Sequence, residues 1–72
     1  MISTGNLLNW FSFHKPENAD QVGAYEVIRQ AGLEFATVIL RNTPPSADQT
    51  TAIRTVREAV MWANASIACK GL

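Results

Sequence analysis

The chain has two consecutive prolines, Pro44 and Pro45, a little past its middle, and Ser46 follows them directly. A proline disfavours the helical conformation in the residue before it, so a preceding helix must end near residues 41–42. Ser46 is a favourable N-cap for a new helix, because its hydroxyl can accept from the N–H of Gln49 while the Gln49 side chain reaches back. The sequence therefore predicts two helices joined by a short turn.

The segment from about Pro16 to Arg41 has the pattern of the first helix. Pro16 suits the first helical turn, and Asn18 with Gln21 offers an alternative N-cap pair. The apolar positions that follow a helical spacing are Val22, Tyr25, Ile28, Gly32, Phe35 and Ile39. Further apolar residues widen this stripe, so the helix is expected to contact more than one neighbour.

The segment from about Ser46 to Lys70 has the pattern of the second helix, and Gly71 is expected to end it. One apolar seam consists of Ile53, Val56, Val60, Ala63 and Ile67. A second stripe beside it consists of Ala59, Trp62, Ser66 and Cys69. Because the connector is short, the two helices are expected to lie antiparallel.

The predicted fold class is all-α: an antiparallel two-helix hairpin at residues 16–72, preceded by a short aromatic segment at residues 1–15. A chain of 72 residues is small for a stable core, and its single cysteine excludes an intramolecular disulfide. Two helices bury one seam and leave large apolar side chains partly uncovered. Assembly of identical copies is therefore predicted.

Composition excludes several classes of function. Six basic and six acidic residues give a formal net charge of zero, which disfavours DNA coating. No apolar run is long enough for a transmembrane helix, and residues 1–6 lack a basic secretory n-region, so a cytoplasmic protein is expected. One histidine and one cysteine are too few for a structural zinc site, and no cofactor is expected.

Catalytic groups are sparse, whereas nucleotide-binding groups are present. A dyad of His14 and Cys69 would join opposite ends of the chain, and the simpler interpretation of Cys69 is a small apolar residue. Arg54 and Glu58 are spaced as a solvated helical ion pair. Residues 10–15 combine aromatic rings with cations, as base stacking and phosphate binding require, although the rings alone would also suit packing on a neighbouring hairpin. Asn64 lies in an apolar stretch and must bond a partner helix or a ligand.

Three stretches carry a resemblance to a known family. They are Phe13-His14-Lys15-Pro16 with Gln21 and Tyr25-Glu26, then residues 42–49, then residues 56–68. Together they resemble the helical-hairpin proteins with which bacteriophages sequester cyclic-oligonucleotide signals of the CBASS defence. The related Thoeris-antagonist sponges share this hairpin.

The resemblance implies a homo-hexamer, built as a trimer of dimers, with cyclic dinucleotides such as cGAMP in pockets between interlocked protomers. Some members also hold cyclic trinucleotides near the three-fold axis. Binding would withhold the messenger from its effector without hydrolysis, in the cytoplasm of the infected bacterial host.

The resemblance also suggests roles for particular residues. Phe13 matches the aromatic ring that stacks on a base, where relatives are expected to have tyrosine, and Arg29 is the candidate phosphate-binding cation of the first helix. Cys69 stands where trinucleotide-binding members have a cation, with Lys70 beside it, and this departure disfavours a trinucleotide site. The full candidate ligand-binding set is Phe13, His14, Lys15, Tyr25, Arg29, Arg57, Asn64 and Lys70.

Two other functions compatible with the sequence are different in kind. A helical adaptor would bind a protein partner through its apolar faces. A small cyclic-nucleotide hydrolase would use His14 as its catalytic group.

Overall fold

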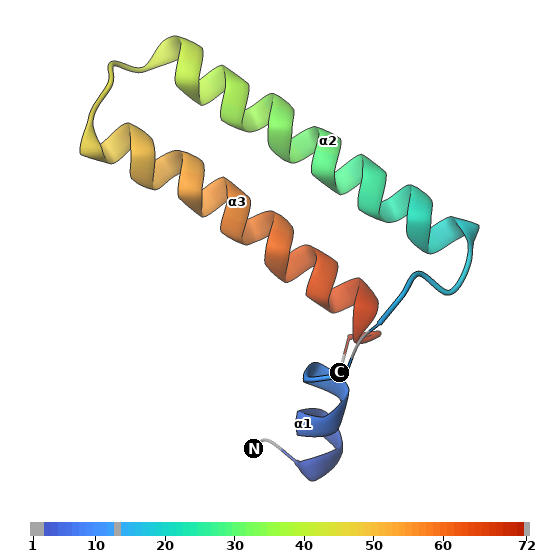
Figure 1. Ribbon diagram of the computed structural model, residues 1–72. Helices are drawn as coiled ribbons and strands as arrows, with labels where there is room; N and C mark the ends of the chain where they lie inside the picture. Colours follow the sequence, from blue (N-terminus) through green and yellow to red (C-terminus); the bar gives the residue numbers. More distant parts are fainter. Residues whose placement is uncertain (1–2, 13, 72) are drawn as a thin grey trace.

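Three helices make up the computed structural model, which describes residues 3–12 and 14–71 (Figure 1). They are α1 (Thr4–Trp10), α2 (Ala19–Asn42) and α3 (Ala47–Ala68). Helices α2 and α3 lie side by side and antiparallel, and α1 lies beyond the end of α3, close to the C-terminal residues. The predicted all-α hairpin is therefore confirmed, whereas α1 was not expected within the N-terminal segment.

Helix α2 begins with the alternative cap that the sequence offered. The Asn18 side chain accepts from the N–H of Gln21 at 2.9 Å, and Gln21 Oε1 accepts from the N–H of Glu17 at 2.8 Å. Placing Pro16 in the first turn was wrong, because Asn18 is the N-cap and the helix begins at Ala19. The helix ends at Asn42, as the two prolines require.

The turn between α2 and α3 is held by side chains from both sides. Ser46 Oγ accepts from the N–H of Gln49 at 3.1 Å, which confirms the predicted cap. The Gln49 side chain does not bond the N–H of Ser46, however. Its Nε2 donates to the carbonyl oxygen of Thr43 at 3.0 Å and to that of Leu40 at 3.4 Å. Gln49 thus satisfies orphan carbonyls at the end of α2, where the helix lacks its own donors.

Helices α2 and α3 lie in close contact at Gly32. A Cβ atom at this position would lie 2.6 Å from Val60 Cγ2, so only glycine allows this separation. Two predicted seam residues, Val22 and Phe35, are instead 42% and 59% exposed, and Ala36 is half-buried beside Phe35. Because the two helices are close together here, small side chains are favoured at the contact, and the large ring of Phe35 stays exposed.

Helix α3 ends in a two-bond cap in which Lys70 adopts the left-handed conformation, with φ of 56°. The N–H of Gly71 donates to the carbonyl oxygen of Ser66 at 2.9 Å, and the N–H of Lys70 donates to that of Ile67 at 3.1 Å. This pattern normally places glycine where Lys70 stands. Gly71 was predicted to stop the helix, but the residue at the stop is Lys70.

A buried core is almost lacking from the described residues, among which only Cys69 is buried. The radius of gyration is 15.2 Å, whereas a compact chain of this length would have about 11 Å. The large apolar side chains that remain exposed are Leu7, Leu8, Trp10, Phe11, Val22, Val27, Leu33, Phe35, Val38, Leu40, Met61 and Trp62. None of the described helices is both long and apolar enough to cross a membrane.

Candidate functional site

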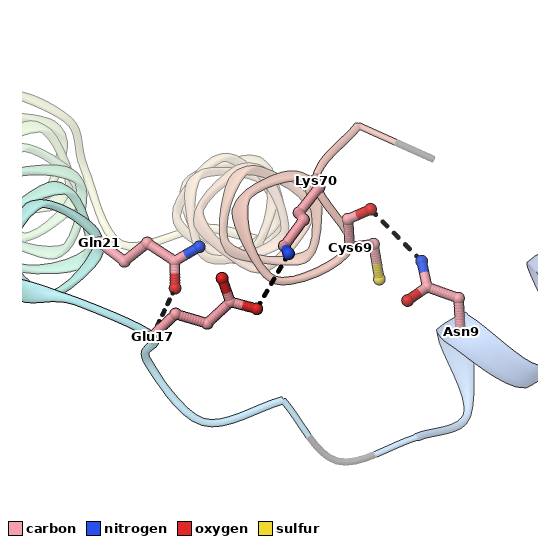
Figure 2. A network of polar contacts seen from close by, with 5 residues as sticks. All are labelled: Asn9, Glu17, Gln21, Cys69 and Lys70. Atoms are coloured by element: carbon pink, nitrogen blue, oxygen red, sulfur yellow. Dashed lines mark hydrogen bonds and ion pairs between the residues drawn. The ribbon is translucent and has the colours of Figure 1, made fainter.

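Three of the predicted ligand-binding residues, His14, Lys15 and Lys70, lie at the open end of the hairpin, which we define as the end opposite the 43–46 connector. Here the last turn of α3 meets both the end of α1 and the chain that leads into α2 (Figure 2). Three parts of the sequence therefore come together in one small region.

Asn9 connects α1 to the rest of the open end. Its side-chain Nδ2 donates to the carbonyl oxygen of Cys69 at 3.3 Å (Figure 2). His14 Nε2 lies 2.5 Å from the carbonyl oxygen of Asn9. Because a carbonyl oxygen only accepts, Nε2 must carry the proton in this contact. His14 is half-buried, and its ring is held against the end of α1.

Lys70 is held on the opposite side of the same turn. Its Nζ lies 3.0 Å from Glu17 Oε1, and the two side chains are 62% and 54% exposed. An ion pair this exposed contributes little stability, so its main effect is on where the two charges are placed. Figure 2 shows the Lys70 side chain pointing toward the chain that enters α2.

Tyr25 and Asn64 lie on the half of the hairpin that faces the open end, since Gly32 pairs with Val60 and both residues are further toward that end. Both side chains are half-buried. The Oδ1 atom of Asn64 is buried and has no hydrogen-bond partner among the described residues. A buried oxygen without a hydrogen bond destabilises the protomer. The prediction that a partner helix or a ligand bonds Asn64 therefore stays a prediction.

Arg29 and Arg57 are not part of the open end. Arg29 is exposed on a shallow face of α2 with Glu26, Gln30 and Glu34. Arg57 borders an apolar hollow of about 250 Å³ near the middle of the hairpin. In a single protomer Arg29 and Arg57 therefore border surfaces other than the cluster of contacts around His14 and Lys70.

Two further residues complete the predicted set. Lys15 is exposed in the chain between α1 and α2. Phe13 lies outside the described residues, so its predicted stacking role stays a prediction.

The sequence did not predict an apolar groove at the junction of α1 and α3. It has a volume of about 600 Å³. Its lining residues are Trp10, Phe11, Trp62, Ala65, Ser66, Cys69 and Gly71. The aromatic residues were recognised as incompletely covered, but their juxtaposition depends on α1, which the sequence did not reveal.

Trp62 also changes the interpretation of Glu58. The indole Nε1 donates to Glu58 Oε1 at 3.2 Å. The predicted ion pair of Glu58 with Arg54 is not formed in the described part of the chain. The bond fixes the ring of Trp62 on α3 while leaving it 69% exposed.

The arrangement suits binding of an anionic, ring-containing molecule. The ammonium and imidazole groups and the aromatic groove come from the same end of the hairpin, and phosphates pair with cations while bases stack on rings. Within residues 3–12 and 14–71, no three His, Cys, Asp or Glu side chains are grouped closely enough to hold a metal ion.

The protein is therefore a small all-helical hairpin with polar, cationic and aromatic groups toward its open end. Residues 5–68 match the model of the family described as the Acb2/Tad1 hairpin domain, and the chain belongs to this family of anti-CBASS and anti-Thoeris sponges. Membership implies a sponge for cyclic oligonucleotides. Neither a curated protein nor a solved structure gives a significant match.

Proposed function

We propose that this protein binds and sequesters cyclic dinucleotides such as cGAMP, without hydrolysing them, as a homo-oligomer in the cytoplasm of an infected bacterial host. The observation that carries the proposal is the nearly complete absence of a core among the described residues of a chain that belongs to the sponge family. Exposed apolar faces on this scale are covered in stable proteins by a partner, and identical copies offer the simplest one. Ligand pockets then form where copies meet.

The separation of the candidate cations supports pockets between copies. His14, Lys15 and Lys70 are at the open end, whereas Arg29 and Arg57 lie nearer the middle of the helices. A cyclic dinucleotide carries two phosphates and two bases, so it needs cations and rings on more than one side. In our proposal the open end of one copy and the helix faces of another supply them, and a hexamer arranged as a trimer of dimers is the expected assembly.

Binding without hydrolysis is supported by membership of the sponge family and by the state of the one thiol. Cys69, the nucleophile of the dyad considered above, is buried at the end of α3. His14 Nε2 donates to the carbonyl oxygen of Asn9, which leaves Nδ1 as the one ring nitrogen with a lone pair. Cys69 stands where trinucleotide-binding relatives are expected to have a cation, so we propose cyclic dinucleotides as the main ligands.

The test is recovery of the ligand. Purified protein is incubated with cyclic GMP–AMP, cyclic di-GMP or cyclic di-AMP, separated from free nucleotide and heated to denature it. The proposal predicts stoichiometric binding of at least one of these and its release intact, as measured by mass spectrometry. Release of a linear product would indicate an enzyme, and absence of binding across the panel would refute the proposal.

A helical adaptor remains the second candidate, because the groove lined by Trp10, Phe11 and Trp62 would also suit an apolar protein segment. The variant Phe13→Ala separates the two functions. The sponge predicts a loss of nucleotide affinity of about 10- to 100-fold with assembly retained, as expected for one lost stacking contact. Phe11→Ala, which removes a ring that is 86% exposed, is the matched control and should bind like the wild type. An adaptor predicts no nucleotide binding by any of these proteins.

A further inference from the structure

The last turn of α3 contacts two segments that are separated in the sequence. Asn9, in α1, donates to the carbonyl oxygen of Cys69 at 3.3 Å. Glu17, just before α2, pairs with the ammonium group of Lys70 at 3.0 Å. The two contacts fall on adjacent residues of one turn, from opposite sides (Figure 2). His14 and Lys15 thus lie in the sequence between two residues that are both attached to this turn.

Both attachments rest on backbone that is itself fixed. The carbonyl of Cys69 belongs to the cap of α3, which the bonds from Lys70 to Ile67 and from Gly71 to Ser66 close. Glu17 is held by the hydrogen bond from its N–H to Gln21 Oε1 at 2.8 Å. A segment tied to rigid backbone at both ends has fewer conformations to lose when a ligand binds.

The left-handed conformation of Lys70 belongs to the same arrangement. A residue other than glycine in this conformation is disfavoured by contacts of its Cβ atom. Here it occurs within the cap, and the Lys70 side chain reaches Glu17. The carbonyl of Cys69 is directed to Asn9 by the same turn.

We propose that Asn9 and Glu17 are positioning residues that, through the last turn of α3, hold His14 and Lys15 in place for the ligand. This inference rests on the proposed function and goes beyond it, because neither residue needs to touch the nucleotide. Removing either attachment leaves the hairpin and its cations intact but lets His14 and Lys15 move. Ligand binding must then also order these two residues, which lowers the affinity.

The experiment measures the dissociation constants of cyclic GMP–AMP, cyclic di-GMP and cyclic di-AMP for Asn9→Ala, Glu17→Gln and the double variant. Each single variant is expected to weaken binding about two- to fivefold, the range for one hydrogen bond or exposed ion pair. The double variant should lose more than either. Native mass spectrometry and thermal unfolding should show assembly and hairpin stability close to those of the wild type.

Two matched controls come from neighbouring residues of the same kind. Asn6 is in α1 but bonds only Ser3, and Asp20 is an exposed carboxylate in the first turn of α2. Asn6→Ala and Asp20→Asn should therefore bind like the wild type. A conservative variant gives a rescue test: Glu17→Asp, which keeps the carboxylate, should bind more tightly than Glu17→Gln.

Three results would overturn the inference. Unchanged affinity in the double variant would show that the attachments do not matter to the ligand. Tighter binding by Glu17→Gln would show that the carboxylate competes with phosphate for Lys70, and affinity of Glu17→Asp no higher than that of Glu17→Gln would show that the ion pair positions nothing. Loss of all nucleotide binding by the wild type, by contrast, would refute the proposed function itself.

Discussion

The two ends of the hairpin are held by different kinds of contact. At the turn, Gln49 donates to Thr43, only six residues away, and the Ser46 cap spans three residues. At the open end, the bond from Asn9 to Cys69 joins residues that are 60 positions apart. The turn can therefore form from local sequence alone, whereas the open end exists only after the hairpin has folded. The open end brings together α1, the chain that enters α2, and the residues that follow α3.

The largest effect is expected between the two ends, where the helices touch. Gly32→Ala should destabilise the protein by about 1–3 kcal/mol, because the new Cβ overlaps Val60, whose side chain has few alternative rotamers. Gly23→Ala is the control: its Cβ would meet nothing within 4 Å, and removal of a helical glycine stabilises by about 0.5–1 kcal/mol. Urea unfolding at one fixed protein concentration measures both. Equal effects of the two variants would show that the helices can separate at Gly32.

The next effect compares the caps at the two ends. Ser46→Ala and Asn18→Ala remove hydrogen bonds of similar length, 3.1 and 2.9 Å. Each should cost about 1 kcal/mol. The cost should be greater at Ser46, because that cap also aligns Gln49 with the end of α2. The same unfolding measurement tests this order, and a larger loss for Asn18→Ala would reverse the proposed difference between the ends.

The cap and the turn are also the features that the sequence predicted best. Pro44, Pro45 and Ser46 act on their immediate neighbours, so propensity alone fixes where α2 ends and α3 begins. Helix α1 was missed because seven residues form a marginal helix without tertiary contacts. The exposure of Phe35 was missed because helical spacing does not reveal how closely two helices approach at Gly32.

For the candidate site, too, the sequence predicted residue types better than contacts between distant segments. The sequence identified His14, Lys15, Tyr25, Asn64 and Lys70 by residue type, and the structure places them toward one end. The sequence gave no sign that Asn9 and Glu17 contribute to the site, because their partners, Cys69 and Lys70, lie at the far end of the chain. Arg29 and Arg57 carry charges suited to phosphate. Charge alone, however, does not show where on the hairpin an arginine lies, or whether it contacts a ligand together with residues of its own copy or of another.

The smallest effect is expected at the end of α3. Lys70→Gly relieves a left-handed residue, worth about 1–2 kcal/mol, and loses an exposed ion pair worth up to about 1 kcal/mol. The ligand-free protein should therefore become slightly more stable, while affinity for the cyclic dinucleotide falls. Gly71→Ala, at φ of 77°, is the control and should destabilise. Thermal unfolding with and without nucleotide tests this, and lower stability of the ligand-free Lys70→Gly protein would mean that the ion pair dominates.

The central claim is that copies of this hairpin cover one another's apolar faces and enclose intact cyclic dinucleotides between them. Native mass spectrometry, with and without cyclic GMP–AMP, cyclic di-GMP and cyclic di-AMP, tests it most directly. The account predicts a homo-oligomer, with a hexamer expected, that gains a fixed number of unmodified nucleotides per assembly. A monomer at micromolar concentration, or an oligomer whose mass none of the nucleotides changes, would contradict it.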